Sequence, residues 1–271
     1  MPDVDLVVNT FERTYRQVLA PGFFDSIEEQ NQCHFERRTV LINNVNRPGE
    51  AEAQARRLVQ SGEIDACYFV ADRLDGALEQ VGLTRKDLGR VPHYTDCALV
   101  AVTLKGSGYL LYWDAEVRLQ KPVNWVCPAI ELMGRDARIF VANPNWCWRP
   151  TLQRETLWEG EGFAFGYGFS DQLFLARGDE LSRPIYGHRC LASLRYPLAH
   201  VEYTFENRVD AYMRTHRRLR ATYLAAVYEH PQSEGAGYPG ISCGERVRLV
   251  RNRCIVKLLR LLPSSNPCWR I

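Results

Sequence analysis

The sequence carries two carboxylates directly after an apolar run. Asp114 and Glu116 flank Ala115 and follow residues 109–113, which are large and apolar. Residues two apart on a strand point to the same side, so the two carboxylates can share Mg²⁺ or Mn²⁺ with phosphate oxygens. Acid pairs of this spacing also occur on solvated strand ends, but the apolar run places this pair at the ligand edge of a sheet. The pair is therefore a candidate metal site.

A second candidate is the segment 165–171, in which glycines alternate with aromatic residues before Asp171. Such glycines let the backbone bend closely around a flat ligand, and aromatic faces suit the C–H faces of a sugar. Ser170 and Asp171 are also good N-cap residues, and we expect a helix over residues 172–177. The segment is either a sugar-binding loop or a helix cap.

Histidine offers a third metal ligand. His200 lies beside the apolar residues 198–199 and could bind as a neutral imidazole. The other histidines are interpreted as surface or satisfied buried side chains: His34, His93, His188, His216 and His230. The nine cysteines form no CxxC pair and are interpreted as reduced, buried thiols, with a catalytic thiol as the alternative.

The first 90 residues contain three strand-then-helix units, which predict an α/β fold with a mostly parallel, doubly wound sheet. We expect strands over residues 5–10, 38–44 and 66–72 and helices over 12–32, 50–61 and 76–81. Ligands bind at the carboxyl ends of such strands, which here carry Asn9, Thr10, Asn43, Asn44 and Asp72. No glycine-rich phosphate loop follows any strand. Further on, we expect a helix over 95–104, irregular structure over 144–168 and a long helical stretch over 201–228.

Composition excludes several classes of protein. With 46% hydrophobic and 24% charged residues the chain is not a disordered one, and a net charge of +2 disfavours a general nucleic-acid binder. No apolar run is long enough to span a bilayer and residues 1–5 do not resemble a leader, so we expect a cytoplasmic protein.

The C-terminal residues differ in charge from the rest. Residues 240–271 hold seven basic residues against one acidic residue, which leaves the remaining chain net acidic. We therefore divide the chain into a domain at 1–235 and a basic extension at 236–271. On a helix, Arg246, Arg253, Lys257 and Arg260 share a face beside Val250, Cys254, Leu258 and Leu261. Such a helix either lies in an anionic membrane interface, on the cytoplasmic side, or packs on the domain.

Taken together, these residues resemble the nucleotide-sugar-dependent glycosyltransferases of the GT-A fold. The general form is the family 2-like type, in which a D-x-D motif stands where Asp114 to Glu116 stand here. Residues 165–171 are similar to the W-G-W-G-G-E-D motif of β-1,4-galactosyltransferases, although Phe165 and Tyr167 replace the tryptophans and Ser170 replaces the glutamate. The element order matches over about residues 4–205.

The resemblance implies a Rossmann-like GT-A domain with a helical C-terminal extension and assigns roles to individual residues. Asp171 is the expected catalytic base, and Asp114, Glu116 and His200 are the expected ligands of Mn²⁺ or Mg²⁺. The expected nucleotide-binding residues are Thr10, Phe11, Glu12, Arg13, Asn44, Asp72, Trp113 and Asp114. The expected acceptor-binding residues are Trp146, Phe165, Tyr167, Gly168 and Ser170.

The implied activity is inverting transfer of a sugar from a nucleoside-diphosphate sugar to a hydroxyl of a glycan or lipid-linked oligosaccharide. This would serve surface or extracellular polysaccharide synthesis. Among the nucleotides, UDP is the expected one. A sugar-1-phosphate nucleotidyltransferase is the rival enzyme, weakened because the basic, glycine-rich loop such enzymes need is missing after Val8. A non-catalytic carbohydrate- or nucleotide-binding module is the third possibility.

Overall fold

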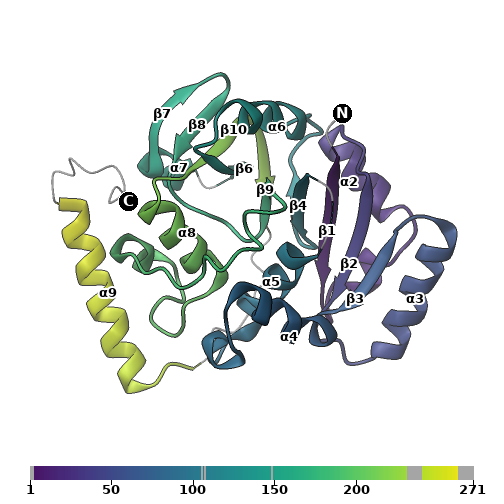
Figure 1. The fold of residues 1–271 in the computed structure, drawn as a ribbon, viewed down its shortest axis with the longest axis horizontal. Coiled ribbons are helices and arrows are strands. Elements are labelled where there is room, and N and C mark those ends of the chain that lie inside the picture. Colours follow the sequence, from purple (N-terminus) through teal and green to yellow (C-terminus); the bar gives the residue numbers. More distant parts are fainter. Residues whose placement is uncertain (1–2, 105, 107, 148, 231–239, 262–271) are drawn as a thin grey trace.

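One mixed β-sheet with helices on both faces organises the chain (Figure 1). The computed structural model describes residues 3–104, 106, 108–147, 149–230 and 240–261. Within them the strand order is β3-β2-β1-β4-β9-β6-β10-β8-β7, and β5 pairs with β10. The strands are β1 (Val4–Thr10), β2 (Arg37–Ile42), β3 (Ala66–Phe69), β4 (Tyr109–Asp114), β5 (Arg118–Leu119), β6 (Ile139–Trp146), β7 (Thr156–Gly160), β8 (Phe163–Gly166), β9 (Leu173–Arg177) and β10 (Leu219–Glu229).

Helices fill most of the connections between these strands. The α-helices are α1 (Tyr15–Val18), α2 (Phe23–Asn31), α3 (Pro48–Ser61), α4 (Val70–Val81), α5 (Asp96–Thr103), α6 (Val126–Arg135), α7 (Arg149–Glu155), α8 (Phe205–Thr215) and α9 (Cys243–Leu261). The 3-10 helices in the described part of the chain are η1 (Arg85–Leu88), η2 (Pro92–Tyr94) and η3 (Leu191–Arg195).

Strand direction decides which residues meet. β1 is parallel to β2 and β4, whereas β9 is antiparallel to both β4 and β6, and β10 is parallel to β6. The carboxyl ends of β1, β4, β6 and β10 and the amino end of β9 therefore share one edge of the sheet. The predicted α/β class with a mostly parallel sheet is confirmed.

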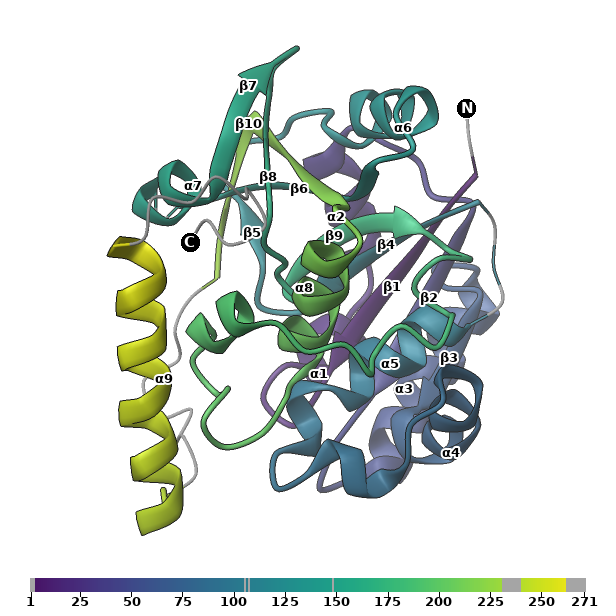
Figure 2. The same ribbon diagram turned by 60° about the vertical axis from the view of Figure 1, so that its left-hand side comes forward.

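Both faces of the sheet are buried. Along β1, Val4, Leu6 and Val8 pack with residues of α1, α2, α3 and α6, while Val7 packs with residues of α4, α5 and α8. This alternation follows from the two-residue repeat of a strand. Figure 2 shows the two helical layers on either side of the sheet. The strands are thereby rigidly held, and so are the side chains at their ends.

Two predictions about the N-terminal elements were wrong in detail. The expected helix over 12–32 is broken into α1 and α2, because Gly22 adopts a left-handed conformation with φ of 81° after Pro21. The expected strand over 66–72 ends at Phe69, and α4 begins at once. Val70, Leu74 and residues 77, 78 and 81 are buried at helical spacing, so Asp72 lies in the first turn of a helix and not at a strand end.

Two predictions about the C-terminal half were also wrong. Residues 173–177 form β9 and not a helix, because the run fits between β4 and β6 with four of its five side chains buried. The helical stretch expected over 201–228 is α8 followed by β10, separated at Arg217, whose φ is 53°. Residues 144–168, expected to be irregular, hold the end of β6, α7 and the β7–β8 hairpin.

The basic extension contains a long helix, α9, which contacts η3 and lies along one side of the molecule (Figure 1). The predicted boundary at residues 235 and 236, and residues 262–271, lie outside the described residues. Among the described helices, none combines the length and the apolar character that crossing a bilayer requires.

Candidate metal and catalytic site

Two carboxylates and one imidazole converge at the carboxyl edge of the sheet. Ligand atoms of Asp114, Glu116 and His230 all lie within 4.8 Å of one another. His230 Nε2 lies 3.5 Å from Asp114 Oδ1 and 3.9 Å from Glu116 Oε2. Carboxylate oxygens and a neutral imidazole suit Mn²⁺ or Mg²⁺, so this donor set fits the expected cation.

The strand ends position this cluster. Asp114 is the last residue of β4, and His230 follows the last residue of β10, which runs in the same direction. Asn9, from β1, donates from Nδ2 to Asp114 Oδ2 (3.1 Å), and the Glu116 N–H donates to Asp114 Oδ1 (2.9 Å). These contacts hold the Asp114 carboxylate in place. On the other side, Arg13 Nη2 lies 3.6 Å from Glu116 Oε1.

The charge of His230 reflects its neighbours. Burial acts to lower the pKa of His230, but the hydrogen bond to Asp114 and the charges of Asp114 and Glu116 raise it above its ordinary value. A cation bound between the carboxylates would oppose that protonation, because metal ligation requires the neutral ring.

Asp171 lies at the same edge, two residues before β9. The Asp114 N–H donates to the carbonyl of Gln172 (2.8 Å), which ties this turn to the end of β4. Burial, with the charge of Asp114 added, raises the pKa of Asp171 to about 7. A carboxylate with a pKa near neutrality suits proton transfer at physiological pH.

Glu206 is a second carboxyl beside Asp171 that sequence reasoning did not single out. Its Oε1 accepts a hydrogen bond from the Asp171 N–H (3.3 Å), and it lies in the first turn of α8. Burial, together with the charge of Asp171, raises the pKa of Glu206 well above its usual range. Ionisation of Glu206 is therefore disfavoured while Asp171 carries a charge.

A cavity of about 410 Å³ opens beside this cluster. Ser170 and Gln172, on either side of Asp171, line it, together with Glu206 and His230. Aromatic side chains of Trp146 and Tyr196 form part of its wall, with polar and arginine side chains between them. Its size and its mixture of ring faces and polar groups fit a sugar-sized ligand.

The structure places some predicted residues near the cluster and others away from it. Phe11, Glu12 and Arg13 follow β1, where the Glu12 carboxylate accepts from the Asn46 N–H (2.6 Å) and Arg13 reaches Glu116. Asn44 follows β2 and is exposed. Trp146 and Ser170 line the cavity. The roles of these residues stay predictions.

His200 is the clearest correction. It is not part of the Asp114–Glu116 group, and it lines a different cavity, of about 740 Å³, against α9. Its carbonyl accepts a hydrogen bond from Arg248 Nε (2.9 Å). The imidazole that lies beside Asp114 and Glu116 is that of His230, for which the sequence predicts a surface or satisfied side chain. β10 brings His230 to the site. The sequence predicts a helix over 201–228, so it does not predict this strand.

Other predicted contacts are corrected by burial or position. Asp72 is exposed on α4 and lines a cavity with residues of α3. Thr10 and Trp113 have no exposed surface, so their side chains do not face a nucleotide. Phe165 and Tyr167 are buried in the core on the face with α1–α3 and α6. Phe165 and Tyr167 therefore support the Gly-aromatic segment from the core, whereas Phe169 of the same segment lines the cavity beside Asp171.

A buried network of ion pairs forms part of the wall of this cavity. Glu155 accepts from Arg195 (2.7 Å) and Arg220 (2.8 Å), and Asp210 accepts from Arg195 (3.0 Å) and Arg214 (2.9 Å). Burial alone would raise the pKa of Glu155, but the charges of Arg195 and Arg220 hold it below its ordinary value. Because each of these charges has an opposite charge beside it, the network can fix the positions of these side chains.

Gly168→Ala is expected to destabilise the protein by about 2–4 kcal/mol. Gly168 has φ of 124°, and an added Cβ would lie 2.5 Å from Glu155 Oε2 and 2.8 Å from Arg220 Nη1. The substitution would therefore strain the backbone and displace a buried ion pair. Urea denaturation measures the loss. Gly134→Ala, in a helix with open space around the glycine, is the matched control and should change stability by less than about 1 kcal/mol.

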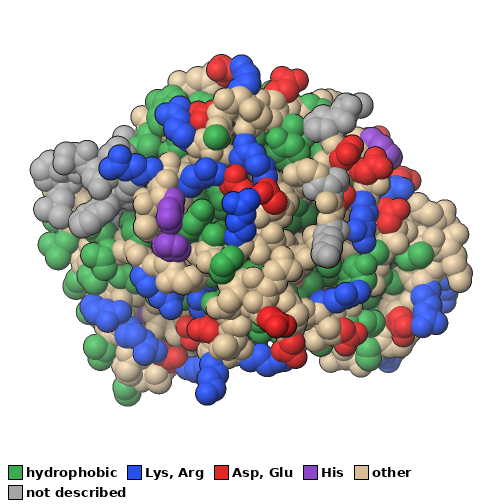
Figure 3. Space-filling model, in the orientation of Figure 1, with side chains coloured by type: hydrophobic (Ala, Val, Ile, Leu, Met, Phe, Trp, Pro, Cys, Tyr) green, Lys and Arg blue, Asp and Glu red, His purple; other side chains and the backbone are tan. Residues whose placement is uncertain are grey.

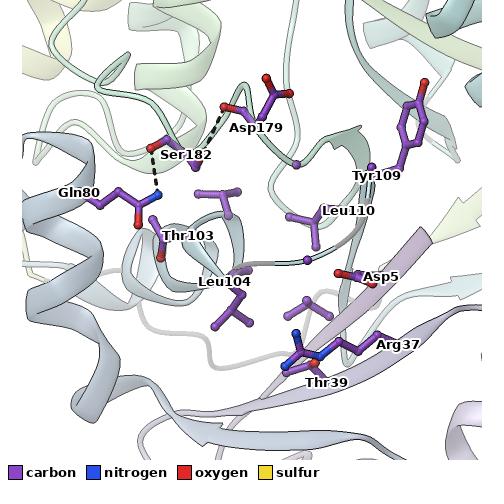
Figure 4. A pocket seen from close by; sticks show the side chains of 16 residues that line it. Asp5, Arg37, Thr39, Gln80, Thr103, Leu104, Tyr109, Leu110, Asp179 and Ser182 are labelled. Atoms are coloured by element: carbon purple, nitrogen blue, oxygen red, sulfur yellow. Dashed lines mark hydrogen bonds between the residues drawn. The ribbon is translucent and has the colours of Figure 1, made fainter. Parts of the chain in front are cut away.

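A further cavity, of about 520 Å³, lies at the opposite edge of the sheet, where β1, β2 and β4 begin (Figure 4). Asp5, Arg37 and Tyr109 line it near the starts of these strands. On another side, Gln80 Nε2 donates to the carbonyl of Ser182 (3.4 Å). Its position separates it from the Asp114, Glu116 and His230 cluster, so it is not part of the candidate site.

Comparison with known proteins gave structural similarities alone. No protein-family model matches the sequence, and no curated protein matches it. Among solved structures, the chain is similar to a glucosyl-3-phosphoglycerate synthase from Mycobacterium tuberculosis in complex with Mn²⁺, UDP and phosphoglyceric acid, with 12% identity and a TM-score of 0.47. That match covers 97% of this chain and 80% of the other.

Two further solved structures are similar to the chain at comparable sequence identities and TM-scores. GalNAc-T7 with UDP, GalNAc and Mn²⁺ has 11% identity and a TM-score of 0.47, covering 93% of this chain; the chain spans 48% of that protein. Mouse xyloside xylosyltransferase 1 has 13% identity and a TM-score of 0.43, covering 80% of this chain and 84% of that one. At these identities and scores the activity must be argued from the chain's own residues.

Proposed function

We propose that the chain is a metal-assisted, inverting glycosyltransferase of the GT-A type that uses a nucleoside-diphosphate sugar, UDP first, as donor. The observation that carries the proposal is the meeting of Asp114, Glu116 and His230 at one edge of the sheet, with Asp171 at the same edge. This arrangement supplies the two requirements of the reaction, a cation site for the leaving diphosphate and a base for the acceptor.

Asp114, Glu116 and His230 would hold Mn²⁺ or Mg²⁺. When bound, the cation supplies charge stabilisation for the departing diphosphate. Arg13, beside Glu116 and half-exposed, adds a second positive charge close to the same position. The loop after β1 and the end of β2, with Phe11, Glu12 and Asn44, are the proposed contacts of the base and ribose.

Asp171 acts on the acceptor side. Its carboxylate accepts the proton of an acceptor hydroxyl while the oxygen of that hydroxyl attacks the anomeric carbon. The bond from the anomeric carbon to the phosphate oxygen breaks on the opposite face, and the diphosphate leaves with the electron pair. A single displacement of this kind inverts the anomeric configuration. The raised pKa of Glu206 disfavours a second negative charge beside the base.

The acceptor is proposed to be a hydroxyl of a glycan or of a lipid-linked oligosaccharide, as in surface or extracellular polysaccharide synthesis. The cavity beside Asp171 supports a sugar acceptor, since Trp146 and Tyr196 can stack on sugar rings and Ser170 can hydrogen-bond to hydroxyls. Trp146 and Ser170 are thus the proposed acceptor contacts that remain from the Gly-aromatic and tryptophan-rich segments.

Release of nucleoside diphosphate tests the proposal. The protein is incubated with UDP-, GDP- and dTDP-sugars, Mn²⁺ and glycan or lipid-linked acceptors, and free nucleotide is measured with and without a chelator. We expect one donor, a UDP-sugar before the others, to release nucleoside diphosphate. This release should be sensitive to the chelator and should increase when the right acceptor is added. Pyrophosphate formation from a sugar-1-phosphate and a nucleoside triphosphate, with no diphosphate release from any donor, would reject it.

His230→Ala is expected to weaken Mn²⁺ activation by more than about tenfold, because it removes one of three ligands. The matched variant is His200→Ala, which keeps the backbone carbonyl that Arg248 contacts and leaves the cation site intact. Activity is titrated with Mn²⁺ for each. If His200→Ala raises the required Mn²⁺ concentration and His230→Ala does not, the geometric assignment of the third ligand is wrong.

A further inference from the structure

We propose that α9 is a docking helix for an anionic lipid surface. It presents a stripe of exposed apolar residues, Val247, Val250, Leu258 and Leu261, which are 60–72% exposed, with Cys254 exposed between them. At 3.6 residues per turn these five side chains fall within about 80° of the helix circumference. An exposed stripe of this kind marks a contact surface.

The opposite face of α9 is fixed to the rest of the molecule. Val256 packs with Leu194 and Ala199, and Leu259 and Asn252 are buried. Glu245 pairs with Arg90 Nη1 (2.5 Å), which anchors the first turn of the helix. The apolar stripe therefore faces outward, because the opposite face of the helix is packed against the rest of the molecule. Hydrophobic and basic side chains are visible along this side of the molecule (Figure 3).

The positive charge of α9 favours an anionic partner. The helix carries six basic residues, and its single acidic residue, Glu245, is buried and ion-paired. At helical spacing, Arg246, Arg253 and Lys257 border the apolar stripe on one side and Arg251 borders it on the other. Long basic side chains beside an apolar stripe can reach phosphate headgroups while valine and leucine enter the acyl boundary.

Other occupants fit this surface less well. A second copy of the chain would bring an equal set of cations against the same stripe, and like charges repel at close range. A nucleic acid would satisfy the cations but would leave the valine and leucine side chains without an apolar partner. A lipid surface with anionic headgroups satisfies both.

Docking through α9 also bears on the acceptor. Arg260, from the last turn of α9, lines the cavity beside Asp171, so a membrane-bound α9 would set that cavity at the lipid surface. This step rests on the proposed function and favours a lipid-linked acceptor. The docking itself does not depend on catalysis.

Vesicle sedimentation of the 271-residue chain tests the proposal. One set of vesicles is phosphatidylcholine alone, and the other contains about one-third phosphatidylglycerol. We expect binding to the anionic vesicles only, and weaker binding as salt screens the basic side chains. No binding to either set, or equal binding to both, would overturn the proposal.

Two double variants identify the surface. Val250→Glu with Leu258→Glu should abolish binding, and Arg246→Gln with Arg253→Gln should weaken partitioning by about thirty-fold. The matched controls are Val59→Glu and Arg56→Gln with Arg57→Gln, on the exposed face of α3, which should bind as the unaltered protein does. Circular dichroism confirms folding of each variant.

The readouts separate this proposal from the catalytic one. Nucleotide release with a water-soluble acceptor should be unchanged in all four variants, because none touches the cation cluster or Asp171. Loss of binding in the controls as well would overturn the assignment to α9. A concentration-dependent dimer in gel filtration, broken by Leu258→Glu without lipid, would instead assign the stripe to a second copy of the chain.

Discussion

Asp171→Asn is expected to lower kcat for sugar transfer by about 10²–10⁴-fold, while binding of the donor nucleotide persists. The amide keeps the size of the side chain and cannot accept the hydroxyl proton. Binding of UDP in the presence of Mn²⁺, measured by calorimetry, should be retained because Asp171 is not one of the three cation ligands. If binding is lost along with activity, Asp171 is structural and the assignment as base is wrong.

The pH dependence of activity provides a second test of Asp171 as the base. Because the pKa of Asp171 is raised to about 7, the active, ionised base forms as the pH rises through this value. Activity should therefore fall on the acid side of about pH 7, and neutralisation of the Asp114 charge by a bound cation should move this limb to lower pH. A rate that does not vary between about pH 5 and 8 contradicts the role.

Stability provides the control for folding. A carboxyl whose pKa is raised in the folded state contributes stability that is complete below its unfolded value and is lost as the pH rises through about 7. The amide of the Asp171→Asn variant stays neutral at every pH, so this variant should gain about 2–4 kcal/mol in unfolding free energy at pH 8, and the gain should shrink toward pH 4. Asp72→Asn, exposed on α4, should show neither effect.

Asp114→Asn is expected to lower kcat/KM by about 10²-fold or more, because Asp114 lies at the centre of the proposed cation site. Its carboxylate accepts from Asn9 and Glu116 and faces His230, and an amide in its place loses the charge that attracts the cation. Calorimetric titration with Mn²⁺ in the presence of UDP measures the loss directly.

The same variant should alter the base. The charge of Asp114 contributes to the raised pKa of Asp171, so the pKa of Asp171 should be lower in Asp114→Asn than in the unaltered protein without a cation. Glu116→Gln is the comparison. Because Arg13 already lies beside Glu116, loss of the Glu116 charge should weaken Mn²⁺ binding less than loss of the Asp114 charge. Equal and undiminished Mn²⁺ binding in both variants would show that the cluster is not a cation site.

The sequence predicts the donor half of the sheet well, because its elements are local. β1, β2 and β4 are short apolar runs whose character does not depend on distant partners, and polar residues at their ends identify the edge where ligands bind. Asp114 and Glu116 could be identified for this reason. The position of Asp171 after alternating glycines makes it a candidate base, although the helix expected beyond it is a strand.

The acceptor half was harder to predict because its strands are defined by their neighbours. β9 enters the sheet antiparallel between β4 and β6, and nothing within residues 173–177 requires strand over helix. β10 follows an arginine-rich helix without a glycine or proline to mark the change, so His230 could not be placed at the edge. Glu206 is hidden in the same way, since its proximity to Asp171 depends on how α8 packs.

The spacing of the cation ligands along the chain has a consequence for folding. Asp114 and His230 are more than a hundred residues apart and come from strands with β9 and β6 between them. A bound cation would therefore close a long loop, as a reversible cross-link between the two halves of the sheet. Occupancy of the proposed cation site would raise the melting temperature and protect the end of β10 from proteolysis, so the cation would stabilise the fold as well as support the proposed reaction.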